Sequence, residues 1–129
     1  MSGSQFTSGQ WVGFYNYSAR SKKYLMDLVL EFRNGVISGE GADGIGFFII
    51  AGHYSEGDGE CSWDKTYVGN RTHTVAYRGF GEKKGIWGTW NLPGGKGGFH
   101  IWPLSDGAPL PSLEEEKPEE LPLVTHSRN

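Results

Sequence analysis

The residues of this chain that could hold a metal or cofactor are scattered and lack the spacing of a known site. The four histidines, His53, His73, His100 and His126, do not show the paired spacing of a zinc site. The segment Glu56–Glu60 alternates acids with glycines as part of a calcium loop does, but it lacks the remaining ligands, and a solvated turn explains it equally well. We therefore expect no metal and no cofactor.

Candidate catalytic groups are equally sparse. Cys61 stands next to Ser62 without a base on its own predicted hairpin face. Asp64 and His73 fall on one predicted face and are the best acid–base candidates, although such pairs are more often surface neighbours. The glycine-rich run at Pro93–Gly98 lacks the Ser or Thr and the helix of a phosphate-binding loop. These patterns favour a protein that is not an enzyme.

Tryptophan is the residue type best suited to binding here. Trp11, Trp63 and Trp90 are predicted to share the inward face of a curved sheet. In that position they would line a cavity for a small apolar or aromatic ligand, and quenching of their fluorescence would report its binding. The alternative is that these rings, with Phe32, simply fill the interior. In that case the domain would be a solid module for protein interaction.

The elements that must position these rings are strands. Apolar and polar residues alternate with period two between frequent turn signals, and no stretch shows sustained helical periodicity. Eight strands in sequence predict one all-β domain, an antiparallel up-and-down barrel, over residues 9–104. Residues 1–8 are expected to be a flexible N-terminus. The predicted strands cover residues 11–18, 24–33, 36–41, 45–54, 60–68, 71–79, 85–91 and 98–104.

The strongest local signal is the Asn34-Gly35 pair. Both residues tolerate the positive φ angles of a two-residue type I′ turn, which fixes the pairing of the strands on either side. This turn places Phe32 opposite Ile37, with Gly39 and Gly41 opposite the next two leucines. One face then carries Met26, Leu28, Leu30 and Phe32, whereas the other is charged, as expected of a barrel wall.

The same reasoning at Gly69-Asn70 predicts a second hairpin. A two-residue turn there would pair Lys65 with Thr74 and Trp63 with Ala76. The face that holds Trp63, Lys65, Tyr67, Thr72, Thr74 and Ala76 is then expected to point inward. Val75 and Tyr77 fall on the opposite face.

The strand at residues 45–54 breaks the alternation, because Phe47–Ile50 is apolar on both faces. A covering tail or loop would explain this pattern. A subunit interface would explain it better, and we expect a homo-oligomer formed through this strand. Trp87 and Trp102, which face away from Trp90 and Ile101, would belong to the same patch.

Several short motifs resemble the calycin group, the lipocalin- and avidin-like barrels, and lie nearer the avidin side. Gly9-Gln10-Trp11 is similar to the Gly-x-Trp opening of their first strand, and Trp63-Asp64-Lys65 and Gly88-Thr89-Trp90 resemble segments that carry binding-site tryptophans. The resemblance implies a ligand site at the open end of a barrel. Together with the inward-facing tryptophans, it gives a predicted ligand-binding set of Trp11, Tyr15, Trp63, Thr74 and Trp90.

The resemblance does not extend to the polar groups that hold biotin in the avidin-like family. Its first-loop asparagine and serine have only Asn16 and Ser18 as counterparts, and its tyrosine after the third strand is replaced by Gly41. The aspartate of its last strand has no counterpart in Gly98–Trp102. A polar ligand needs its hydrogen bonds matched, so we expect a ligand other than biotin.

Charge and composition narrow the possible partners. The part of the chain before residue 105 is nearly neutral, so it has no basic footprint for nucleic acid, and no apolar run is long enough to cross a bilayer. The segment 105–129 is acidic and broken by prolines, and we expect it to be disordered; the alternative is a docking peptide centred on Leu121, Leu123 and Val124. Cys61 is the only cysteine, and the N-terminus lacks a secretion signal, so we expect a cytoplasmic protein.

Overall fold

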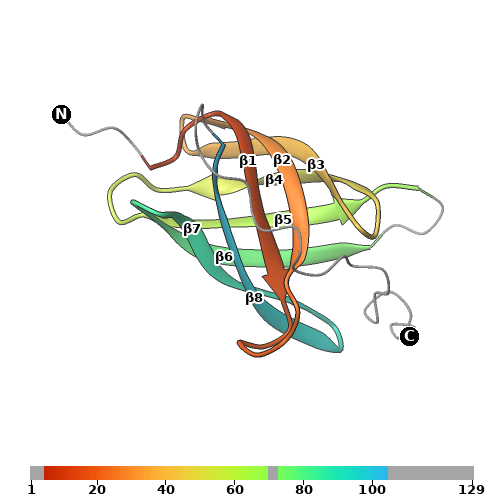
Figure 1. Ribbon diagram of the computed structural model, residues 1–129. Helices are drawn as coiled ribbons and strands as arrows, with labels where there is room; N and C mark the ends of the chain where they lie inside the picture. The colour runs from red at the N-terminus through yellow and green to blue at the C-terminus, as the bar shows by residue number, and fades with distance from the viewer. Residues whose placement is uncertain (1–4, 70–72, 105–129) are drawn as a thin grey trace.

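A computed structural model of the chain describes residues 5–69 and 73–104, and its regular structure consists of eight strands. Each strand pairs antiparallel with its neighbour in sequence, and β1 also pairs with β8, which closes the barrel (Figure 1). This confirms the predicted fold class. None of the described residues forms a helix able to span a membrane. The strands are β1 (Gly9–Asn16), β2 (Tyr24–Arg33), β3 (Val36–Asp43), β4 (Phe47–Tyr54), β5 (Glu60–Tyr67), β6 (Thr74–Glu82), β7 (Gly85–Leu92) and β8 (Gly95–Pro103).

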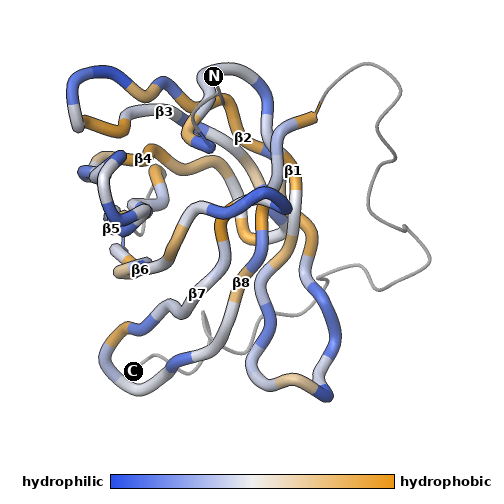
Figure 2. Tube along the Cα trace, turned by 90° about the vertical axis from the view of Figure 1, so that its left-hand side faces the viewer, coloured by the Kyte–Doolittle hydropathy of each residue, from blue (hydrophilic) through white to orange (hydrophobic). Residues whose placement is uncertain are grey.

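The strands follow one another around a ring in the order of the sequence (Figure 2). Because side chains alternate between the two faces of a strand, every second residue points into the ring. The alternation is cleanest in β2, where Met26, Leu28, Leu30 and Phe32 are buried and the residues between them are exposed. The core therefore lies inside the barrel and receives side chains from all eight strands.

The first predicted hairpin is confirmed. Asn34 and Gly35 have φ angles of 51° and 82°, which are the positive values that a type I′ turn requires. Phe32 pairs with Ile37, and Gly39 and Gly41 lie opposite Leu30 and Leu28. The two residues of this turn thus set which side chains of β2 and β3 enter the core.

Aromatic rings fill the space that inward-facing glycines leave. A Cβ atom built on Gly41 would lie 2.7 Å from the ring of Phe48, and one built on Gly79 would lie 3.0 Å from the ring of Phe99. Real Cβ atoms essentially never come closer than 3.0 Å to another heavy atom, and a Cβ on Gly79 would also lie 2.5 Å from the carbonyl oxygen of Trp87, so a side chain at either position would displace its neighbours. At both positions the space beside the glycine is occupied by an aromatic side chain of the protein itself.

The second predicted hairpin has the wrong register. Lys65 pairs with Val75 and Trp63 pairs with Tyr77, each one residue away from the prediction. The backbone N–H of Val68 donates to the carbonyl of Phe47 in β4, so it cannot close a two-residue turn with β6. The connection is therefore longer than the predicted turn. Asn70, Arg71 and Thr72 lie outside the described residues.

The apolar strand β4 has one buried and one exposed face. Phe48 and Ile50 are in the core, whereas Phe47 is 71% exposed and Ile49 49% exposed on the outer wall. Trp87 is 52% exposed on the outer wall of β7. Two strands separate β4 from β7 along one side of the ring and four along the other, so the prediction that Trp87 and Trp102 join the β4 patch is wrong.

The two ends of the barrel differ. The Phe6 end, where the β2–β3, β4–β5 and β6–β7 turns lie, is packed by the segment before β1. Phe6 is buried, and its ring centroid lies 4.8 Å from that of Tyr54 and 5.5 Å from that of Phe32. Sequence analysis assigned residues 1–8 to a flexible terminus, but the aromatic side chain of Phe6 draws this segment into the core. Residues 1–4 are not among those described.

The opposite end is named here the Asp43 end. It carries the β1–β2, β3–β4, β5–β6 and β7–β8 connections, and Asp43 is the last residue of β3. The interior beside these connections is rich in polar aromatic side chains. The candidate site lies at this end.

Candidate functional site

The three predicted tryptophans all point inward and are buried, as expected. They are distributed along the barrel and do not share one surface. Trp11 packs against Phe32 toward the Phe6 end, with 5.6 Å between ring centroids. Trp63 stacks on Tyr77, and Trp90 meets Tyr17 edge to face at 5.3 Å. Of the three, Trp90 is the one that lies in the tyrosine cluster of the Asp43 end.

Thr74, also predicted to line the site, faces the wrong way. It is exposed on the outer wall, and its Oγ1 lies 3.0 Å from Oγ1 of Thr66. The one-residue register difference between β5 and β6 is the cause, because a shift of one residue moves a side chain to the other face of a strand. Val75 and Tyr77 point inward in place of Thr74 and Ala76.

The interior toward the Asp43 end contains an ion pair. The ammonium of Lys65 lies 2.6 Å from Oδ2 of Asp43, and the two side chains are 1% and 0% exposed. The ammonium also donates to the hydroxyl of Tyr77 at 3.2 Å and contacts Sδ of Met26 at 3.7 Å. Each of its three N–H groups therefore has an acceptor, which a buried ammonium needs.

Aromatic rings surround the same ammonium. Nζ of Lys65 lies 4.4 Å from the ring centroid of Phe48, 4.9 Å from that of Tyr15 and 5.0 Å from that of Tyr67. The negative faces of aromatic rings attract a cation, most strongly where water is excluded. These rings form an aromatic cage that stabilises the charged form of Lys65, which burial alone would destabilise.

The side chain of Asp43 bonds both to groups inside the barrel and to the backbone of the β3–β4 connection. Its Oδ2 accepts a hydrogen bond from the hydroxyl of Tyr67 at 2.5 Å in addition to that from Lys65. Its Oδ1 accepts from the backbone N–H groups of Ile45 at 2.9 Å and Gly46 at 3.4 Å. An aspartate readily makes such bonds to the backbone that follows it, so local turn chemistry places the carboxylate here.

Burial governs the titration of the cluster. It lowers the pKa of Lys65, while the charge of Asp43 acts in the opposite direction. It raises the pKa of Tyr15, Tyr67 and Tyr77, and the nearby Asp43 carboxylate raises the pKa of all three further. The tyrosine hydroxyls are therefore neutral donors at physiological pH.

Two buried polar atoms of this end have no hydrogen-bond partner among the described residues. They are the hydroxyl of Tyr15 and Nε2 of His73. The ring of Tyr15 stacks on Tyr24 at 5.3 Å, and the ring of His73 lies 4.8 Å from that of Tyr67. Burial lowers the pKa of His73. Unpaired buried polar atoms are uncommon in proteins and call for an explanation.

The other reactive residues are not combined into a site. Asp64 is exposed on the outer wall, whereas His73 packs on the inward-facing Tyr67, so they do not share a face as predicted. Cys61 is buried, and burial raises the pKa of its thiol to about 12. Within residues 5–69 and 73–104, no three His, Cys, Asp or Glu side chains gather in a way that could hold a metal ion.

Sequence reasoning missed the central members of the cluster, Asp43 and Tyr77. It placed Lys65 on the same inward face as Trp63 and Tyr67 without drawing the consequence. A lysine at an inward position of a barrel strand requires a buried counter-ion. This requirement is the signal that points to an inward-facing aspartate at the end of a nearby strand.

Comparisons of the chain with protein-family models, with curated proteins and with solved structures found no match. Its class is therefore defined by its architecture. The protein is a closed, eight-stranded, antiparallel up-and-down β-barrel with an aromatic-caged ion pair inside.

The ion pair predicts strong coupling between Lys65 and Asp43 in stability. Lys65→Met and Asp43→Asn each leave one partner buried without its counter-ion, and each should lower the free energy of unfolding by about 3–5 kcal/mol. The double variant should cost less than the sum of the two, because it leaves no unpaired charge. Urea denaturation of the four proteins measures the coupling, and additive costs would contradict it.

The buried tyrosines predict cooperative unfolding at alkaline pH. Above pH 10 the unfolded chain loses tyrosine protons that Tyr15, Tyr67 and Tyr77 keep in the folded barrel. The free energy of unfolding should therefore fall as the pH rises, by at most about 4 kcal/mol per pH unit for three groups.

Lys65 has the opposite effect, because its lowered pKa makes the free energy of unfolding rise with pH. This effect operates only below the ordinary lysine pKa of 10.5, where the unfolded chain holds a proton that the folded barrel has lost. Tyrosinate absorbance and circular dichroism followed together against pH test this expectation. Ionisation of all the tyrosines near pH 10 in a chain that keeps its β-sheet signal would contradict it.

Proposed function

We propose that this barrel is a non-catalytic binding protein that takes a small aromatic ligand at its Asp43 end. One observation carries the proposal: the hydroxyl of Tyr15 is buried at this end without a hydrogen-bond partner among the described side chains and backbone. A buried hydroxyl left unpaired costs about 1–3 kcal/mol, and a ligand atom that accepted a hydrogen bond from it would recover that energy.

The surrounding rings support an aromatic ligand. Tyr15, Tyr17, Tyr24 and Trp90 contact one another with centroid separations of 5.3 to 6.4 Å, mostly edge to face. A further flat ring could extend this arrangement, because aromatic pairs favour such geometries. The likeness of Gly88-Thr89-Trp90 to a calycin segment with a binding-site tryptophan supports the same end.

The ion pair limits the charge of the ligand. Lys65 and Asp43 satisfy each other, and both carboxylate oxygens of Asp43 already accept hydrogen bonds. An ionic ligand would have to separate the pair to gain a counter-ion. Tyr15 and the neutral His73 instead offer hydrogen bonds to an uncharged molecule, so the proposed ligand is a neutral aromatic compound with one or two polar atoms.

Binding of phenol, indole and benzimidazole, followed by thermal shift and tryptophan fluorescence, tests this proposal. Tyr15→Phe removes one hydrogen bond and should weaken binding about 2- to 10-fold, from a contribution of about 0.5–1.5 kcal/mol. Thr74→Ala, on the outer wall, should leave binding unchanged and serves as the control. If none of these compounds, nor a wider aromatic library, shifts the melting temperature or quenches the fluorescence, the proposal is wrong.

A second candidate function, a homo-oligomeric interaction module, rests on the outer face of β4. Phe47, Ile49 and Val68 are each about half exposed or more, and the backbone of Val68 is bonded to that of Phe47. A shallow hollow of about 680 Å³ lies on the same wall, over the small side chains of Ser38, Ala51, Ser62 and Ala76. Exposed apolar side chains beside a hollow of this kind are typical of a subunit interface.

Light scattering after size-exclusion chromatography tests the oligomer. The proposal expects more than one copy, and Ile49→Lys should shift the protein toward the monomer by placing a charge in the interface. Val29→Lys, at an equally exposed position on β2, should leave the assembly intact. A strict monomer at all concentrations would contradict the interface.

A further inference from the structure

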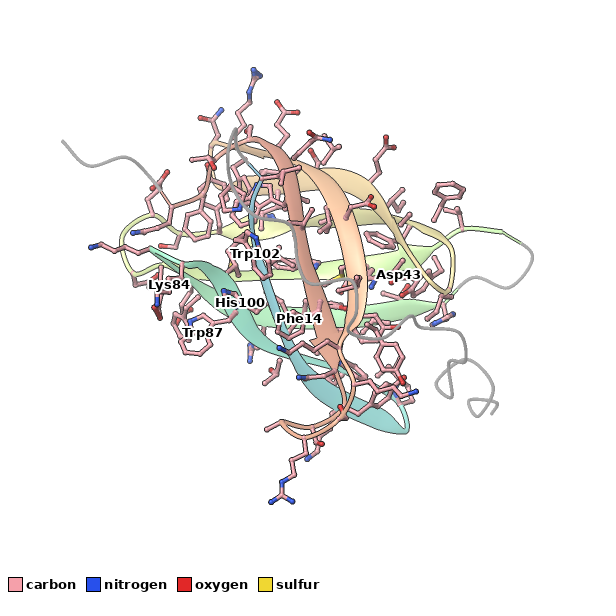
Figure 3. All side chains as sticks on the ribbon, viewed as in Figure 1. Phe14, Asp43, Lys84, Trp87, His100 and Trp102 are labelled. Atoms are coloured by element: carbon pink, nitrogen blue, oxygen red, sulfur yellow. The ribbon has the colours of Figure 1, made fainter. Side chains whose placement is uncertain are left out.

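The outer wall of β7, β8 and β1 carries an aromatic ridge formed by Phe14, Trp87, His100 and Trp102 (Figure 3). His100 is at its centre, with ring centroids at 5.0 Å from Trp102, 6.1 Å from Trp87 and 6.2 Å from Phe14. All four side chains are partly or largely exposed. The ridge is thus a partly exposed aromatic surface on the outer wall of three neighbouring strands.

Lysines lie at both ends of the ridge. At the Asp43 end, Nζ of Lys23 lies 4.9 Å above the ring of Phe14, and Lys22 is exposed beside it. At the Phe6 end, the carbonyl of Lys84 lies 2.8 Å from Nε2 of His100, and the lysine is exposed. The carboxylate of Glu82 is bonded to Nε1 of Trp87. The surface therefore suits a ligand that is apolar over the rings and acidic at the Asp43 end, where Lys22 and Lys23 lie.

The chain itself contains a segment of this composition. The described part ends at Leu104, whose N–H donates to the carbonyl of Gln10 at the Phe6 end of β1. The sequence then continues with Pro109-Leu110-Pro111, Leu113 and the acidic run Glu114–Glu116. Aromatic surfaces bind proline-rich peptides because the polyproline helix is preformed and loses little entropy.

The length of this segment matches the ridge. Strand β1 has 8 residues and, at about 3.3 Å per residue, measures roughly 26 Å between its ends. A polyproline helix rises about 3.1 Å per residue, so about eight residues after Leu104 span the same distance. The acids that follow, Glu114–Glu116, would then arrive beside Lys22 and Lys23.

We propose that residues 105–116 dock in the same molecule along the aromatic ridge, with the prolines and leucines on its rings and Glu114–Glu116 against Lys22 and Lys23. The docked segment shields the ridge from other partners. This surface is on a different part of the wall from the β4 patch and outside the interior of the Asp43 end. The inference is therefore independent of both proposed functions.

A nitroxide attached at Ser112→Cys in the full chain tests the docking by paramagnetic broadening of backbone amide signals. Cys61 is buried with a thiol pKa of about 12, so the new cysteine is the one that reacts. The proposal expects broadening at Phe14, His100 and Lys23 and none on the outer wall of β4. Absent broadening, or broadening over β4, would overturn it.

Charge exchange separates docking from chance proximity. Glu115→Lys with Glu116→Lys should abolish the broadening, and adding Lys22→Glu with Lys23→Glu should restore it. Glu119→Lys with Glu120→Lys changes the net charge equally and should leave the broadening in place. Equal loss in both glutamate pairs, or no rescue, would overturn the proposal.

Docking to a second copy is distinguished by mixing chains. Spin-labelled chains without ¹⁵N are combined with ¹⁵N-labelled chains that carry no nitroxide. Docking within one molecule expects no broadening in this mixture. Broadening there equal to that in the singly labelled sample would show that the segment binds a neighbouring molecule, which overturns the proposal.

Discussion

The buried ammonium of Lys65 is the constraint on which the interior of this barrel depends. An isolated charge in such a place would be prohibitively unstable, and the residues around it are those that remove the penalty. Asp43 provides the counter-ion, Tyr77 and Met26 accept hydrogen bonds from the ammonium, and Phe48 contributes an aromatic face. Most buried ion pairs contribute little to net stability, but separating one is costly. The pair therefore ties β3 to β5 and, through the hydroxyl of Tyr77, to β6.

Local chemistry made the fold and one hairpin predictable. Period-two alternation and frequent turns indicated eight strands, and Asn34-Gly35 gave the correct pairing of β2 with β3 because two residues determine that turn. Gly69-Asn70 gave a similar signal but the wrong pairing. The backbone of Val68 is bonded to β4, a contact from a distant part of the chain that no local pattern reveals. One residue of register was enough to place Thr74 outside and Tyr77 inside.

The candidate site was predictable only in part for the same reason. Alternation within β1, β5 and β7 placed Tyr15, Trp63 and Trp90 inside correctly. Asp43 and Lys65 are 22 residues apart, on strands that are not adjacent in the ring, and their meeting depends on the registers of two strand pairs in succession, β3 with β4 and β4 with β5. A sequence shows that a buried lysine needs a partner. It does not show which acidic residue lies at the same level of the closed barrel and points toward that lysine.

The two carboxylate oxygens of Asp43 bond to different parts of the barrel, so they couple its rim to its interior. One oxygen fastens the chain that crosses the rim at Ile45 and Gly46, and the other neutralises the cation below. An outward displacement of that rim segment would pull on the carboxylate and so weaken its bond to Lys65. Opening the barrel at this point would therefore carry the cost of unpairing a buried cation.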